Sequence, residues 1–273
     1  PPTWRAASCN ACACPGAALI GAGAAGADGG TCPVIFGANF SPYYGAEDPN
    51  GGDGQITDAE LRERMEAIAP SINWIRSFGC NEDLREVGEY GHALGLHTAV
   101  GAWIDEETEA GLAENQRQVA CLCEEIAKGN VDLAIVGSEA LLRGDVTAER
   151  LLGYLAQVKE CVAASDHPDV PVTYADVYGV LLANQALLDA SDVVFANLYP
   201  YWEGVAVDQA VAYVSTWYQM LEAAAPGKPV WVSESGWPDC GETLNDAVPS
   251  PANAGDYFVD FVSWAEQNEV PYL

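Results

Sequence analysis

The sequence predicts an α/β fold, a (β/α)8 TIM barrel, on three observations. Short apolar runs alternate with amphipathic helical patterns from Val34 to the end of the chain. The runs recur about every 34 residues, the length of one strand–helix–strand step. They are continuously apolar, as in parallel strands that are covered by helices. Eight such runs favour a barrel, and no G-x-G-x-x-G motif follows the first run to support a dinucleotide-binding sheet.

Seven of the apolar runs are long enough for complete strands, and an eighth begins at Val270 and stops at Leu273. Because this last run is short, we expect the eighth strand of the barrel to be truncated. Trp103 and Trp231 lie inside apolar runs and are expected in the core. The seven complete strands are expected at Val34–Phe40, Ile72–Phe78, Leu96–Trp103, Val131–Val136, Val170–Ala175, Asp192–Leu198 and Pro229–Ser233.

Apolar residues at helical spacing predict helices between these strands. Ser250 and Pro251 fit the N-cap and the first position of the last helix, whose apolar stripe includes Phe258. The other stripes are Leu61–Met65–Ile68, Leu84–Val87–Gly91–Leu94, Leu151–Leu155–Val158–Val162 and Val207–Val211–Val214–Tyr218–Leu221.

The predicted barrel occupies residues 34–273, and residues 1–33 form a tail that is rich in Ala, Gly and Cys. Within the tail, the apolar stretch Ala17–Ala27 has 11 residues, whereas a membrane span needs roughly 20. No basic segment precedes it, so we expect no signal peptide there. About 240 residues remain, which suit one barrel better than two domains.

The chain is strongly acidic, with 40 acidic and 11 basic residues and a formal net charge of −29. Nucleic acids and anionic membranes attract basic surfaces, so the sequence predicts neither as a partner. A hydrophobic content of 49% excludes a disordered chain. The composition therefore describes an acidic protein that forms a core.

The sequence predicts neither a cofactor nor a metal site. Cys9, Cys12 and Cys14 are spaced too tightly for a zinc ribbon, and the three histidines form no ligand pattern. Nine cysteines is an odd number, and stray or locally paired thiols are the expected reading. Cys121 and Cys123 lie two residues apart on an expected helix and therefore face different directions.

One segment partly resembles a calcium-binding loop. Residues 53–60 match the second half of a calcium-binding loop, but Pro49 and Gly51 occupy earlier positions that need side-chain oxygens. Thr57 and Glu60 also fit a helix-capping box, which is the simpler interpretation.

The ends of the predicted strands carry carboxylates and aromatic rings, at the face where barrel enzymes place their active sites. Glu139 follows the fourth strand and Glu234 follows the seventh. A single Glu there is also explained by the positive end of the next helix. The pair, with aromatic rings between its members, suits glycoside hydrolysis, in which one carboxyl protonates the leaving oxygen and the other attacks or activates water. The other side chains at these ends are Tyr174, Asp176, Tyr199, Tyr201, Trp202 and Trp237, of which Tyr201 and Trp202 also fit loop packing.

Three segments resemble glycoside hydrolase family 17, namely V-D-L-A-I-V-G-S-E, N-L-Y-P-Y-W and K-P-V-W-V-S-E-S-G-W-P-D-C-G. The N-F-S-P-Y and I-N-W-I-R-S-F segments are similar to microbial members of that family. The resemblance covers roughly residues 34–273. It implies a (β/α)8 barrel and a retaining enzyme that acts on β-1,3-glucan, whose two carboxyl groups are expected about 5–5.5 Å apart.

Matched residue by residue, the resemblance assigns Glu139 as the acid/base and Glu234 as the nucleophile, with Tyr199 close to the nucleophile. The wider clan usually has Asn before the acid/base, where it binds the substrate 2-hydroxyl, but this chain has Ser138. Including Tyr199, the residues expected to bind substrate are Asn39, Tyr43, Ser138, Tyr174, Asp176, Tyr199, Trp202 and Trp237.

The sequence therefore predicts a retaining glycoside hydrolase that cleaves β-1,3-glucan, with a β-1,3-glucan transglycosylase as the second hypothesis. A non-catalytic glucan-binding barrel is the alternative from another class, motivated by Ser138 and the short last strand. We expect a monomer whose partner is a neutral β-glucan, because an acidic protein tolerates a neutral polysaccharide. This substrate class implies an extracellular or periplasmic location.

Overall fold

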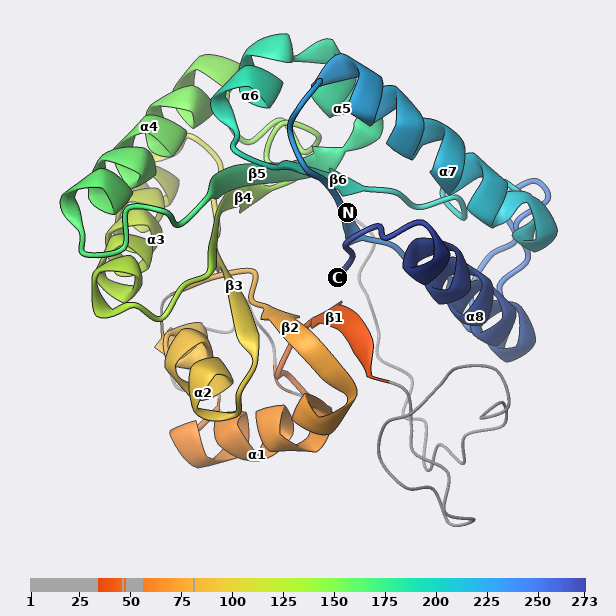
Figure 1. Cartoon of the computed structure of the whole chain (residues 1–273), viewed down its shortest axis with the longest axis horizontal. Coiled ribbons are helices and arrows are strands. Elements are labelled where there is room, and N and C mark those ends of the chain that lie inside the picture. Colours follow the sequence, from red (N-terminus) through yellow and green to blue (C-terminus); the bar gives the residue numbers. More distant parts are fainter. Residues whose placement is uncertain (1–33, 46, 48–55, 81) are drawn as a thin grey trace.

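Seven parallel strands follow one another in chain order around one curved sheet, and helices cover its outer face (Figure 1). The structure is a computed structural model that describes residues 34–45, 47, 56–80 and 82–273, so the predicted tail lies outside the described residues. The strands are β1 (Ile35–Asn39), β2 (Ile72–Arg76), β3 (His97–Ala102), β4 (Leu133–Ser138), β5 (Val172–Val177), β6 (Val194–Asn197) and β7 (Val230–Glu234). The predicted barrel and its seven strands are confirmed, with β4 and β5 each beginning and ending two residues later than expected.

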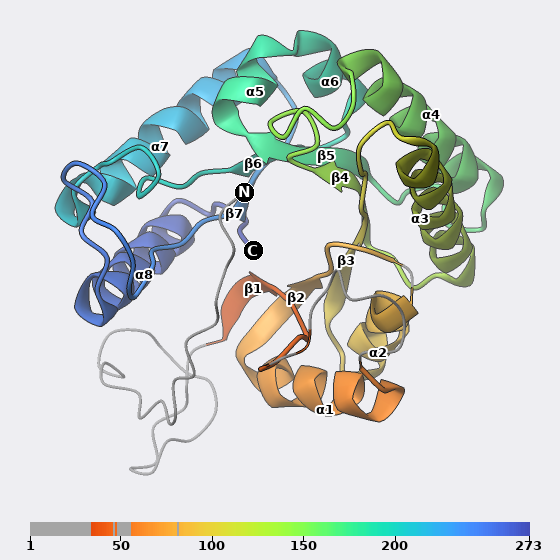
Figure 2. The ribbon, with the colours of Figure 1, turned by 180° about the vertical axis from the view of Figure 1, so that it is seen from behind.

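The end of the chain lies between β7 and β1, where the eighth strand of a barrel belongs (Figure 2). The N–H of Val232 donates to the carbonyl of Pro271 at 3.0 Å, and the N–H of Leu273 donates back to Val232 at 2.9 Å. On the other side, the Tyr272 hydroxyl accepts a hydrogen bond from the N–H of Phe36 in β1. A single parallel bridge pairs this segment with β7, as expected for a truncated eighth strand.

Helices alternate with the strands as the apolar stripes predict. Thr57 and Glu60 form the expected capping box at the start of the first helix, and Ser250 caps the last one through the N–H of Asn253. Phe258 is 51% exposed, so its assignment to the apolar stripe is wrong. The helices are α1 (Asp58–Ile68), α2 (Val87–Ala93), α3 (Glu109–Lys128), α4 (Ala148–Ala164), α5 (Tyr178–Ala183), α6 (Gln185–Ala190), α7 (Val207–Ala224) and α8 (Pro251–Gln267), with short 3₁₀ turns η1 (Ala69–Ser71) and η2 (Glu82–Leu84).

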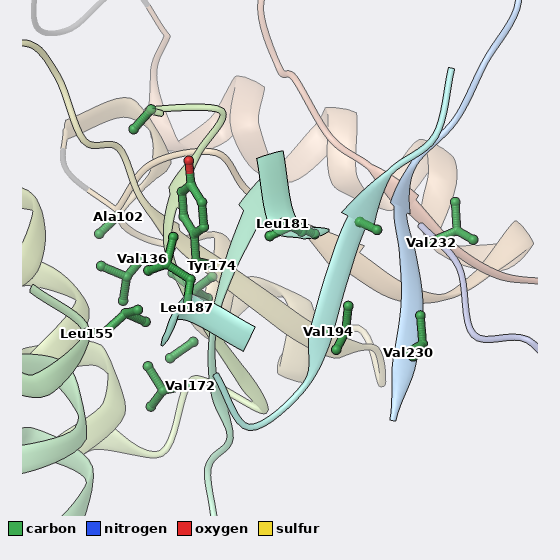
Figure 3. Close-up of a cluster of buried hydrophobic side chains, with 14 of the residues drawn as sticks. Ala102, Val136, Leu155, Val172, Tyr174, Leu181, Leu187, Val194, Val230 and Val232 are labelled. Atoms are coloured by element: carbon green, nitrogen blue, oxygen red, sulfur yellow. The ribbon is translucent and has the colours of Figure 1, made fainter. Parts of the chain in front are cut away.

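The core has two layers, one inside the barrel and one between the sheet and its helices. Inside, Trp74 and Trp231 pack edge to face with ring centroids 5.0 Å apart, against Phe195 and Leu273. Between the sheet and the helices, aliphatic side chains from the strands meet those of α4, α5 and α6 (Figure 3). Trp231 therefore belongs to the core, as predicted.

Two disulfides fasten α3 to its neighbours. Cys121 pairs with Cys80 in the loop after β2, and Cys123 pairs with Cys161 in α4. The prediction that Cys121 and Cys123 face different directions is confirmed. Among the described helices, none combines the length and the apolar character that crossing a bilayer demands.

Candidate active site

A cavity of about 790 Å³ opens at the carboxyl ends of the strands and brings the two predicted catalytic carboxylates together. Glu139 reaches it from the end of β4, and Glu234 reaches it from the end of β7. The cavity is lined by Phe78, Trp103, Ser138, Glu139, Leu142, Arg143, Val177, Tyr178, Gly179, Asn197, Tyr199, Trp202, Glu203 and Glu234. It has the size and the mix of aromatic rings and polar groups that are typical of a small-ligand site.

The backbone is irregular where β4 delivers Glu139. The register between β4 and β5 shifts between Ile135 and Ser138, and Gly137 has a φ of 84°. Glu139 itself has a φ of 55°. This conformation costs a residue with a Cβ about 1–3 kcal/mol, and it persists only where the surrounding contacts hold the backbone in place. Arg143 supplies part of that support, since its guanidinium donates to the carbonyl of Ser138 at 2.6 Å and to that of Ile104 at 3.1 Å. The irregularity redirects the Glu139 side chain at the strand end.

The surroundings of Glu139 favour its protonated form. Burial raises its pKa above the ordinary value of 4.5, and the nearby charges of Glu234 and Asp176 act in the same direction. Nδ2 of Asn197 donates to Oε1 of Glu139 at 2.8 Å and, with the charge of Arg143, partly opposes that rise. The raised pKa suits this carboxyl to the role of a proton donor.

Three hydrogen-bond donors surround the carboxyl oxygens of Glu234. Oε1 accepts hydrogen bonds from Nη1 of Arg76 at 2.9 Å and from Oγ of Ser138 at 3.0 Å. Oε2 accepts one from the Tyr199 hydroxyl at 3.0 Å. Burial and the charge of Glu234 raise the pKa of Tyr199, so its hydroxyl keeps the proton that it donates. A carboxylate that only accepts hydrogen bonds is suited to nucleophilic attack.

Arg76 contacts Glu234, and the sequence interpretation gave it no role at the site. Its side chain is 1% exposed and forms an ion pair with Glu234 across 158 residues of sequence. Nη1 also contacts Oδ1 of Asn39 and the carbonyl of Ser233, and the guanidinium lies over the rings of Phe78 and Phe195. Burying an arginine inside an apolar strand costs free energy unless the charge is paired. The position of Arg76 in an apolar run was therefore the sequence signal for a buried acidic partner.

The structure corrects two predicted substrate contacts. Tyr174 and Asp176 are 1% and 0% exposed and lie beneath the loop that follows β4, outside the cavity lining. The Tyr174 hydroxyl donates to Oδ2 of Asp176 and accepts from the N–H of Leu141. Asp176 also accepts from the N–H of Leu142 and from that of Val177. The pair therefore supports the loop that carries Glu139 and is too deeply buried to touch a substrate.

Four of the remaining predicted residues lie in the cavity lining or directly behind it. Trp202 is 47% exposed and lines the cavity, as Tyr199 and Ser138 do. Asn39 lies behind Glu234, where its Nδ2 donates to the carbonyl of Ser233 at 3.0 Å.

Two expected substrate contacts lie among packed side chains. Tyr43 packs against the hydrophobic cluster that includes Phe40. Trp237 packs on Tyr201 and Tyr257, with its Nε1–H donated to the carbonyl of Val248.

Other cavity residues had no assigned role in the sequence interpretation. Trp103, expected in the core, lines the cavity instead, with the guanidinium of Arg143 4.3 Å from its ring centroid. Tyr178 begins α5 at the cavity and stacks on Trp217. Asn197 ends β6 and, like Glu139, follows an apolar run. A polar residue at the end of a barrel strand is a candidate for the active site, and this position could have identified Asn197 from the sequence.

No cluster of three or more His, Cys, Asp or Glu side chains arranged to hold a metal occurs within the described part of the chain. The calcium-like loop lies largely outside it, since residues 48–55 are not described, and Thr57 and Glu60 serve as a helix cap.

Comparison with known proteins yields relatives of one enzymatic class. The glucan 1,3-beta-glucosidase of Candida albicans is 31% identical over 65% of this chain and 61% of its own length. The glucan 1,3-beta-glucosidase of Saccharomyces cerevisiae is 27% identical over 78% of this chain and 72% of its own. A relative from Aspergillus fumigatus matches 78% of the chain at 28% identity, and this match spans only 37% of that protein.

Solved structures agree with these sequence relatives. The glycoside hydrolase family 17 beta-1,3-glucanosyltransferase from Rhizomucor miehei superimposes with a TM-score of 0.74 at 29% identity, covering 88% of this chain and 85% of that one. The sequence profile of the BtgE/BtgC glycoside hydrolase domain matches residues 37–273, from within β1 to the last residue. The chain therefore belongs to the BtgE/BtgC glycoside hydrolase domain family.

Proposed function

We propose that this protein cleaves β-1,3-glucan by double displacement with retention, using Glu139 as the acid/base and Glu234 as the nucleophile. The observation that carries the proposal is the contrast between these two carboxyl groups in one cavity. Burial favours the protonated form of Glu139, whereas three donors surround the oxygens of Glu234. The substrate follows from the names of the relatives in Candida albicans and Saccharomyces cerevisiae.

In the first step, a carboxylate oxygen of Glu234 bonds to the anomeric carbon while the glycosidic C–O bond breaks. The electron pair of that bond goes to the departing sugar oxygen, which takes the proton of Glu139. The hydrogen bond from Asn197 orients the carboxyl for this transfer. Exposed aromatic surface such as Trp202 offers a face on which the sugar ring can pack.

In the second step, Glu139 removes a proton from the incoming nucleophile, whose oxygen bonds to the anomeric carbon and releases Glu234. Water gives hydrolysis and a sugar hydroxyl gives transglycosylation. The second outcome is our second candidate function, favoured by the similarity to the Rhizomucor miehei glucanosyltransferase and by the exposed apolar side chains of Leu142 and Trp202 at the cavity.

Incubation with laminarin, followed by product analysis, tests the proposal. Shorter glucan products indicate hydrolysis, and products longer than the donor indicate transfer. Glu234→Ala is expected to abolish both, and azide is expected to restore turnover with an inverted glycosyl azide as product. Binding of laminarin with neither cleavage nor transfer contradicts catalysis and supports the glucan-binding alternative.

We also propose that the protein acts outside the reducing interior of the cell. The support is physical, since Cys80–Cys121 and Cys123–Cys161 are disulfides and such bonds persist in oxidising compartments. Thiol titration of protein isolated under alkylating conditions tests this, and reduced Cys123 and Cys161 in that material contradict it.

A further inference from the structure

The two oxygens of Glu234 are not equivalent. A carboxylate presents about four acceptor sites, two on each oxygen. Both sites of Oε1 are occupied, by Nη1 of Arg76 and Oγ of Ser138. Among the described residues, Oε2 accepts one hydrogen bond, from Tyr199, which leaves it one open site. The oxygen with the open site is the one that can bond to carbon.

The Ser138 hydroxyl is hydrogen-bonded both as a donor and as an acceptor. Its only O–H is donated to Glu234, and its oxygen accepts from Nη2 of Arg76 at 3.1 Å. Its side chain therefore bridges the ion pair between Arg76 and Glu234, and Ser138 is 5% exposed. A role as a donor to the substrate 2-hydroxyl would require breaking the bond to Glu234.

We propose that Ser138 is a positioning residue for the nucleophile, which with Arg76 holds Oε1 of Glu234 so that Oε2 is the attacking atom. As Oε2 bonds to the anomeric carbon, the bond to the leaving oxygen breaks and its electron pair departs with that oxygen. Oε1 then becomes the carbonyl oxygen of the glycosyl ester and keeps its two donors. The same donors therefore orient the carboxyl before and after attack.

This inference rests on the proposed function, and the test separates the two. Wild-type protein is first assayed on laminarin, where no cleavage or transfer contradicts the proposed function alone. The rate of glycosylation is then measured with β-laminaribiosyl fluoride and with the analogue that lacks the 2-hydroxyl on the reacting sugar. Fluoride departs with little help from an acid, so this rate reports on Glu234 rather than on Glu139, the residue next to Ser138.

Ser138→Ala is expected to slow glycosylation about 10- to 100-fold, the effect of losing a hydrogen bond to a charged group. The fold-loss is expected to be equal for the parent fluoride and for the 2-deoxy analogue, with KM changed less than about twofold for either. Ser138→Thr keeps the hydroxyl and is expected to restore most of the rate. Ser138→Cys keeps nearly the same volume and has a weaker donor, so its glycosylation rate is expected to lie between those of the alanine and threonine variants. It replaces the alanine variant in the test if that variant does not fold.

Two results overturn the inference. One is a loss that disappears with the 2-deoxy analogue, because it assigns Ser138 to the substrate hydroxyl. The other is an unchanged glycosylation rate in folded Ser138→Ala and Ser138→Cys.

Discussion

Nδ2 of Asn197 lies 2.8 Å from Oε1 of Glu139, so a side chain at the end of β6 holds the carboxyl group at the end of β4. Oδ1 of the same amide accepts a hydrogen bond from Oγ of Ser233, the residue before Glu234. This pairing directs the NH2 group of Asn197 toward Glu139. One neutral side chain thus connects the strands that carry the two carboxylates.

This contact predicts a change in pH dependence. Glu139 must be protonated to act as the acid, so activity is expected to fall as the pH rises through its raised pKa. The hydrogen bond from Asn197 favours the ionised carboxyl, so Asn197→Ala should raise the pKa of Glu139 further and move this alkaline fall to higher pH. Loss of orientation is expected to lower kcat about tenfold.

The measurement is kcat/KM for laminarin oligosaccharides across the pH range. Asn268→Ala, an exposed change in the turn after α8, is the control and should leave the profile unchanged. An alkaline fall that stays in place, or moves to lower pH, contradicts the assigned role.

The sequence was sufficient to predict the barrel and the pairing of Glu139 with Glu234, because the carboxyl ends of parallel barrel strands meet at one face. It could not reveal the partners of Arg76, which depend on register and on contacts across 158 residues. Tyr174 was misplaced for a different reason. Apolar and polar residues lie on both faces of this strand, so its sequence does not show that this ring points toward the helices instead of the cavity.

Two tryptophans that the sequence grouped together are expected to behave differently. Trp202 lines the cavity, whereas Trp237 packs on Tyr201 and Tyr257. Trp202→Ala should raise KM for laminarin about two- to tenfold with little change in melting temperature. Trp237→Ala should lower the melting temperature and leave KM nearly unchanged. Steady-state kinetics and thermal melts of both variants check this, and equal KM effects contradict it.

The two disulfides also form a matched pair. They span 41 and 38 residues, so each should stabilise the fold by a similar amount, roughly 4 kcal/mol in the chain-entropy model. Only Cys80–Cys121 lies near the site, since Phe78 in the same loop lines the cavity and packs on Arg76. The N–H of Cys80 also shares the Gln118 acceptor with that of Trp103.

Replacing both Cys80 and Cys121 by Ala should therefore lower stability and kcat, whereas replacing both Cys123 and Cys161 should lower stability alone. Urea unfolding and kcat at a temperature where both variants are folded distinguish the two effects. Equal losses of kcat would show that the loop after β2 does not depend on its disulfide.

Asp176 and Asp132 are expected to respond to pH with opposite signs. Burial raises the pKa of Asp176 above 3.8, and its hydrogen bonds from Tyr174 and the backbone do not cancel that rise. A carboxyl with a raised pKa contributes stability below its ordinary pKa and loses it as the pH rises through the folded value. The free energy of unfolding of Asp176→Asn, relative to wild type, should therefore increase with pH above about 4, by about 1.4 kcal/mol for each unit of the shift.

Asp132 provides the control. Burial acts to raise its pKa, but hydrogen bonds from His92 and from the N–H of Thr98 outweigh burial and hold the pKa below 3.8. Its contribution is present above the ordinary pKa and is lost as the pH falls through the lower folded value. The stability of Asp132→Asn relative to wild type should therefore decrease as the pH rises from about 2 to 5. Urea unfolding of the three proteins between pH 2 and 8 checks both signs, and parallel pH dependences for the two variants contradict the opposite directions of the two pKa shifts.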